Sequence, residues 1–214
     1  TWVEMTDDDI LEAGKGHIWN AAATMMKDGY DEYCRTFTVE AINNPNKNNI
    51  FHSGDAVIAL NEYPSEFAHN RSWNLVGNPY PCYYDTRAKN TTAPFIVWQG
   101  WNYTAYSPVD DEYIMKPGEA FFIQCPVNVE SITLLEEGRQ MNAMVTDNEY
   151  ITNRAPMVSE RYVFNLTLTG DENLADQTRF VINPEAKMDY EVGRDASKFM
   201  SNVASAAQLY TVEQ

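Results

Sequence analysis

The sequence predicts an all-β protein whose antiparallel sheets pack as a β-sandwich. Short runs of aromatic and β-branched residues are separated by Gly, Pro and Asn, which is typical of short strands joined by tight turns. The composition favours a packed core, since 44% of the 214 residues are hydrophobic and 13% are aromatic. The pattern is densest between Trp73 and Pro126, and we expect several core strands there.

Two strands and a hairpin are expected in this dense stretch. A strand over 73–77 must end before Pro79, because proline has no N–H to donate to a ladder. Residues 95–106 predict a hairpin around Gly100, since glycine suits a turn position that needs a positive φ. A turn over 116–119 leads into the other strand, an apolar run typical of a central buried strand.

Other elements are expected on both sides of this stretch. Residues 6–14 predict a short helix, with Thr6 as its N-cap, aspartates at the positive end of its dipole and Gly14 as its stop. Asp195 is expected to cap a helical turn over 196–200, and a polar loop is expected over 43–49. Further strands are expected at 16–22, 34–40, 129–135, 161–168, 177–182 and 208–212.

The chain is expected to form two modules. Residues 1–140 carry most of the strand pattern and predict a first, jelly-roll-like sandwich. Residues 141–160 are polar and weakly periodic, which predicts an exposed connection. Residues 161–214 return to alternation and predict the N-terminal part of a second sandwich.

Several motifs recur in one known group of proteins. The sequence contains AGKGHIW at 13–19, WNLVGNPYP at 73–81 and KPGEAFFIQ at 116–124. Residues 161–214 add Tyr190, an Asp-Ala-x-Lys segment at 195–198 and a closing Leu-Tyr-Thr. Together these resemble β-sandwich modules near the C-terminus of large secreted or cell-surface proteins of Bacteroidetes.

The resemblance implies a function as well as a fold. Proteins of this group are regarded as non-catalytic adhesion modules, often ahead of a sorting tail for type IX secretion. Their partners would be the neighbouring domains of a larger surface protein, and also a glycan or a host protein. Relatives continue for several strands beyond the equivalent of this chain, so the resemblance implies an incomplete second module. A secreted or cell-surface location in a bacterium is therefore expected.

The charge of the chain narrows the class of partner. The 31 acidic residues outnumber the 15 basic ones and give a formal net charge of −16. Such an excess repels phosphate backbones and anionic membranes, so nucleic acid is not an expected partner. No apolar run reaches the roughly 20 residues of a spanning helix, so the chain is not expected to span a membrane.

Signals for catalysis, metal or cofactor binding are missing from the sequence. Serine-hydrolase and phosphate-cradling glycine motifs are absent. The histidines lack metal-ligand spacing, and the cysteines show no CxxC pair and allow at most one disulfide, so whether they are free stays open. These residues are His17, His52, His69, Cys34, Cys82 and Cys125. We expect a non-enzyme without cofactor or metal, although so many carboxylates leave a glycan-processing enzyme as an alternative.

Four aromatic residues are the candidate ligand-binding residues. They lie on or beside the expected hairpin and are Trp98, Trp101, Tyr103 and Tyr106. Flat aromatic rings stack on sugars, which makes a carbohydrate-binding module the first alternative to a structural module. Half of all strand positions in a sandwich face its core, so the same rings can be packing groups. Side-chain alternation predicts Trp101 and Tyr103 on one face of the second arm and Tyr106 on the other.

Overall fold

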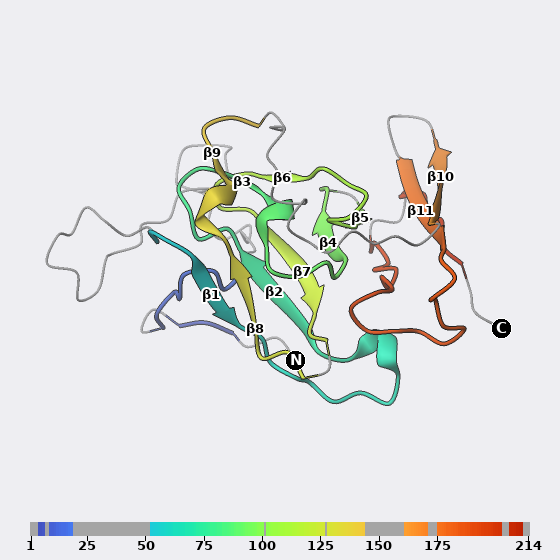
Figure 1. The fold of residues 1–214 in the computed structure, drawn as a ribbon, viewed down its shortest axis with the longest axis horizontal. Helices are drawn as coiled ribbons and strands as arrows, with labels where there is room; N and C mark the ends of the chain where they lie inside the picture. The colour runs from blue at the N-terminus through green and yellow to red at the C-terminus, as the bar shows by residue number, and fades with distance from the viewer. Residues whose placement is uncertain are drawn as a thin grey trace, which may run out of the picture.

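The computed structural model shows an all-β chain with antiparallel sheets, which confirms the predicted fold class (Figure 1). Helical structure in the part of the chain described below is limited to three single 3-10 turns, η2 (Ala68–Asn70), η3 (Thr86–Ala88) and η4 (Glu136–Gly138). The structure describes residues 4–6, 9–18, 52–100, 102–126, 128–143, 161–170, 175–202 and 206–211.

A four-stranded sheet forms the centre of the described residues between 52 and 140, for which we keep the name first module. Its strands follow the order β2-β7-β4-β5, and every neighbouring pair is antiparallel. The bounds are β2 (Trp73–Gly77), β4 (Phe95–Trp98), β5 (Tyr103–Tyr106) and β7 (Ala120–Gln124). The expected hairpin is confirmed as β4–β5, where Gly100 has φ +96° in the turn.

Two smaller sheets complete the first module. One pairs β1 (Ala56–Ala59) with β8 (Ser131–Leu134), and its register places Ile58 opposite Ile132. The other has the order β6-β3-β9, built from β3 (Tyr83–Asp85), β6 (Ile114–Met115) and β9 (Arg139–Gln140). These short strands flank the central sheet in Figure 1.

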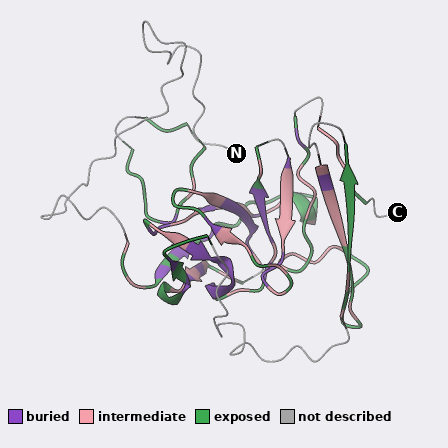
Figure 2. Cartoon of the chain, turned by 90° about the horizontal axis from the view of Figure 1, so that it is seen from above, coloured by how far each residue is buried: buried purple, intermediate pink, exposed green. Residues whose placement is uncertain are grey.

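The core of the first module lies on one face of the four-stranded sheet. Alternate residues of its strands point inward, and the smaller sheets contribute the opposing side chains. Each such buried side chain stabilises the fold by roughly 1.5–3 kcal/mol. Figure 2 shows this buried centre in purple. Its members include Ile58, Val76, Tyr84, Phe95, Val97, Met115, Phe121, Ile123, Ile132 and Leu134.

The C-terminal part consists of a long hairpin followed by an irregular segment. Strands β10 (Tyr162–Thr169) and β11 (Ala175–Ile182) pair antiparallel over eight residues each. Residues 183–202, which we call the strap, contain turns but no strand or helix. In Figure 1 the strap runs from β11 back towards β5 and the 3-10 turn η2.

Two expected helical segments are wrong. Residues 9–14 form no helix: the carboxylate of Asp9 accepts hydrogen bonds from Thr6, and the chain then turns at Gly14. The backbone of Gly14 and Gly16 bonds to β2 instead, with an isolated bridge between Lys15 and Val76. Of the strand expected over 16–22, residues 16–18 form no strand, and the rest lie outside the described residues. Pairing with a sheet edge outweighs a weak local helix preference.

The expected helical turn over 196–200 is also not helical, and the described residues 208–211 form no strand. Asp195 instead accepts a hydrogen bond from the backbone N–H of Glu191, so it closes the preceding turn. The expected strand at 34–40, the loop at 43–49 and most of the connection at 141–160 lie outside the described residues.

Candidate functional site

The outer face of the four-stranded sheet is the candidate site. Residues on this face alternate with those that enter the core, and the strand register sets them side by side. Trp73 lies opposite Gln124, and Trp98 lies opposite Tyr103. The face therefore carries one aromatic ring from each of the four strands, namely Trp73, Trp98, Tyr103 and Phe122. Leu75, Ile96 and Gln124 lie on the same face.

Two of the four predicted aromatic residues lie together on this face. The ring centroids of Trp98 and Tyr103 are 4.7 Å apart, with an interplanar angle of 52°. Trp98 is 40% exposed, whereas Tyr103 is half-buried. Because the two rings are tilted, they do not form one flat platform on which a sugar could stack. Trp101 lies outside the described residues.

Tyr106 lies on the opposite, core-facing side of the sheet. Its ring stacks on Phe95 with centroids 5.7 Å apart and contacts Tyr113 at 4.5 Å. The side-chain amide of Gln99 donates to its hydroxyl at 3.0 Å. Burial raises the pKa of Tyr106, as expected for a phenol held in the core. The predicted split between Tyr103 and Tyr106 is confirmed, so the aromatic candidates do not share one surface.

Phe199 from the strap covers the aromatic outer face. Its ring meets Trp73, Tyr103 and Phe122 edge-on, with centroids 4.6, 5.4 and 5.3 Å away. Edge-to-face contacts of this kind add about 0.5–1.5 kcal/mol per pair beyond the area that they bury. Phe199 therefore occupies the place at which a ligand would contact the three rings.

Tyr190 fixes the strap to the same face through a polar contact. Its hydroxyl donates to Oε1 of Gln124 at 2.7 Å. The Gln124 amide is oriented by its own Nε2, which donates to the backbone carbonyls of Ala68 and Arg71. Burial raises the pKa of Tyr190, so its hydroxyl stays protonated as the donor. Ser197 Oγ donates to the carbonyl of His69 at 2.9 Å and joins the strap to η2.

A buried carboxylate joins the hairpin, the strap and the first module. Asp176 in β11 is 2% exposed and accepts from Lys198 Nζ at 2.5 Å and from Asn102 Nδ2 at 3.2 Å. It also accepts from the backbone N–H of Leu209 at 2.6 Å. A buried charge is tolerated only when it is paired and hydrogen-bonded, and Asp176 meets both conditions.

A second set of charges joins the hairpin to the loop after β5. Arg179 donates through both terminal nitrogens to the two carboxylate oxygens of Asp111, at 2.5 Å each. Arg161 pairs with Asp110 at 2.8 Å. The hydrogen bonds that Arg179 donates to Asp111 raise the pKa of Arg179, so the guanidinium keeps its charge. The two arginines therefore fix the hairpin at two neighbouring points.

The sequence did not indicate the residues that join the strap and the hairpin to the first module. Phe199 and Asp176 carried no motif, because their partners are far away along the chain. Tyr190 and Lys198 belong to the pattern behind the family resemblance, but that pattern did not indicate Gln124 or Asp176 as their partners.

The described residues give no sign of a metal centre. No group of three His, Cys, Asp or Glu side chains in these segments is placed to hold an ion. No helix in the same segments is long and apolar enough to cross a membrane. Comparison of the chain with protein-family models, with curated proteins and with solved structures finds no match.

Proposed function

We propose that the chain is a non-catalytic structural and adhesive module of a secreted or cell-surface bacterial protein. The observation that carries this proposal is the position of Phe199, which fills the aromatic outer face from within the chain. Rings used in this way join two parts of one polypeptide. They leave little of the face open to a ligand.

The polar contacts support the same proposal. Asp176 and Arg179 connect the hairpin to the first module through charge-assisted hydrogen bonds, and Tyr190 connects the strap. Aromatic and charged contacts thus lie along the same boundary between the first module and the C-terminal part. Both kinds of contact must break before the two parts can separate. A module that spaces or presents neighbouring domains needs this property. The excess of acidic residues keeps such a module soluble outside the cell.

One observation favours a carbohydrate-binding module as the second candidate. Trp98 stays 40% exposed beside Tyr103 at the end of β4, and Phe199 of the strap also contacts Tyr103. A single exposed indole with a neighbouring phenol can hold the edge of a sugar ring. This candidate needs saturable binding that depends on Trp98.

A glycan array separates the two candidates. The purified chain is screened against host and dietary glycans beside its Trp98→Ala variant and a Val57→Ala control, since Val57 is exposed on β1. The structural proposal predicts no saturable binding by any of the three. Binding that Trp98→Ala loses and Val57→Ala keeps would replace it with the carbohydrate-binding candidate.

A further inference from the structure

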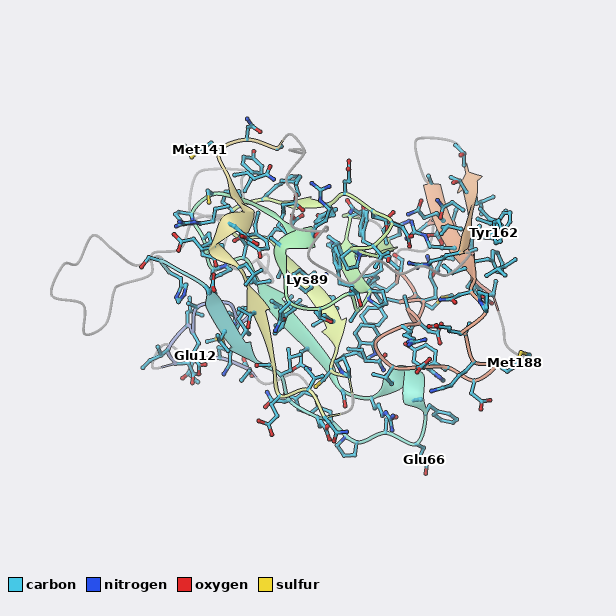
Figure 3. The ribbon with its side chains drawn as sticks, in the orientation of Figure 1. Glu12, Glu66, Lys89, Met141, Tyr162 and Met188 are labelled. Carbon is cyan, nitrogen blue, oxygen red and sulfur yellow. The ribbon has the colours of Figure 1, made fainter. Side chains whose placement is uncertain are left out.

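Strand β10 is the outer edge of the molecule on its C-terminal side. It pairs only with β11 among the described strands, and β11 lies between it and β5. Seven of its eight residues are exposed, so both faces and the free edge meet solvent. Figure 2 shows β10 in green at the side of the molecule, and Figure 3 shows Tyr162 pointing away from the body.

The free edge of β10 has none of the features that prevent strand pairing. Natural edge strands are kept apart by charged side chains, prolines, bulges or short length. The sequence of β10, YVFNLTLT, contains no charge and no proline. Its register with β11 runs over eight consecutive residues without a bulge. An edge of this length and composition is a template for another strand.

One face of β10 adds an apolar surface to the free edge. Alternate residues Tyr162, Phe164, Leu166 and Leu168 are 55%, 51%, 50% and 42% exposed. Phe180 and Ile182 lie opposite two of them on β11 and are also exposed. Exposed apolar area on this scale, on the order of 500 Å², equals the largest patch of an ordinary monomer, and such a patch often serves in binding.

The charge distribution favours a second copy of this chain as the partner at this edge. Copies that carry a net charge of −16 repel each other over most of their surfaces. The described charges on or beside the hairpin strands are paired: Arg161 with Asp110, Arg179 with Asp111, and Asp176 with Lys198. Among the described residues, two copies can therefore bring their β10 strands together without a contact between unpaired like charges.

The two edges of the four-stranded sheet are less available. The edge of β2 accepts and donates backbone hydrogen bonds with Gly14 and Gly16, and Lys15 bridges to Val76. On the far side of the same sheet, β5 lies beside β11. This leaves β10 as the longest unpaired strand edge in the described part of the chain.

We propose that β10 pairs antiparallel with β10 of a second copy, about a two-fold axis at Asn165. Directly opposed residues share one face, so the apolar faces stay continuous only if even-numbered residues oppose even-numbered ones. The axis at Asn165 places Phe164 opposite the partner's Leu166 and Tyr162 opposite the partner's Leu168. It is the register that gives all four apolar residues of β10 an apolar partner.

The resulting dimer has a four-stranded sheet of the order β11-β10-β10-β11, with one continuous apolar face. The interface is isologous, so it closes at two copies and does not grow into a fibre. For an adhesive module, two linked copies would raise the apparent affinity for a repeated target through effective concentration.

Sedimentation equilibrium from low to high micromolar concentration, at physiological salt, tests the dimer. The parent chain is expected to pass reversibly from monomer to dimer. Leu166→Lys places two charges beside the axis and is expected to weaken dimerisation at least tenfold. Val57→Lys adds the same charge at an exposed position of β1 and is expected to leave dimerisation unchanged. A parent chain that stays monomeric throughout overturns the proposal.

Cysteine cross-linking tests the register and does not depend on how Leu166→Lys folds. Asn165→Cys places two thiols across the axis within disulfide distance, so mild oxidation is expected to yield a covalent dimer. Thr169→Cys places them many residues apart and is expected to stay monomeric under the same conditions. The parent chain controls for the natural cysteines. Equal cross-linking of the two variants, or none in either, overturns the pairing about Asn165.

Discussion

Phe199 lies edge-on against Trp73, with ring centroids 4.6 Å apart and an interplanar angle of 68°. Trp73 opens the first strand of the central sheet, and Phe199 belongs to the irregular strap near the C-terminus. The same ring also meets Tyr103 and Phe122. The Phe199 side chain thus joins the strap to the first module and covers the aromatic outer face of its four-stranded sheet.

Replacing Phe199 by alanine is expected to lower the free energy of unfolding by about 2 kcal/mol, because a half-buried aromatic ring is lost and a cavity is left. The adjacent Met200→Ala is the matched control, since Met200 is 52% exposed and a change there is expected to cost less than about 0.5 kcal/mol. Urea unfolding followed by tryptophan fluorescence measures both. Equal effects at the two positions would mean that Phe199 is not anchored.

Asp176→Asn is expected to destabilise the protein by about 2 kcal/mol, because it leaves Lys198 without its buried counter-charge. Lys187→Gln serves as the control. It removes the exposed pair with Glu191, and an exposed pair contributes at most about 1 kcal/mol. Thermal unfolding of both variants gives the comparison. An Asp176→Asn variant as stable as the parent chain would show that the carboxylate does not hold the strap.

Arg179→Lys is expected to loosen the hairpin, because lysine keeps the charge but cannot bind both oxygens of Asp111 at once. Hydrogen exchange read by mass spectrometry should show faster exchange in β10 and β11. Protection in β2 and β7 is expected to stay unchanged, which makes these strands an internal reference. Unaltered exchange in the hairpin would argue against a role for the bidentate pair in docking.

Tyr80 gives a prediction for stability at high pH. Burial raises the pKa of Tyr80 to about 12, and its hydroxyl lies within hydrogen-bond distance of two backbone carbonyls, that of Leu134 at 2.8 Å and that of Gly54 at 2.9 Å. The unfolded chain ionises this phenol near pH 10, so stability is fully present below pH 10 and falls as the pH rises towards 12.

The variant Tyr80→Phe has no hydroxyl, so it does not lose stability through the ionisation of this group at high pH. At pH 7 it is expected to be about 1 kcal/mol less stable than the parent chain, because hydrogen bonds are missing. Between pH 9 and 11 the parent should lose about 1.3 kcal/mol relative to the variant, so the difference should fall to zero and slightly reverse, since only the parent loses stability through this group. Parallel denaturant titrations at each pH follow the difference. A constant difference would mean that Tyr80 titrates alike in both states.

Local pattern explains how much of the fold was predictable. Strands β2, β4, β5, β7, β10 and β11 were predicted, because alternation, Gly100 and the turn over 116–119 mark them in the sequence. The helix expected at 6–14 was wrong, because the backbone of Gly14 pairs with β2. Local propensity cannot register a hydrogen bond to a strand some sixty residues away.

The candidate site was predictable only in part. Alternation correctly separated Tyr103 from Tyr106. It could not show that Phe199 covers Tyr103, because the strap has no periodicity from which its buried side chains could be recognised. The buried charge of Asp176 was hidden for the same reason, since its partners come from β5, the strap and the segment that contains Leu209.

A double-mutant cycle between Trp73 and Phe199 tests the central claim most directly, which is that the strap is packed on the outer aromatic face. Trp73→Leu, Phe199→Leu and the double variant are unfolded in urea beside the parent chain, so every position stays apolar. The edge-on contact predicts a coupling energy of about 1 kcal/mol. Effects that add to within about 0.3 kcal/mol would contradict the account, because the two rings would then not be in contact.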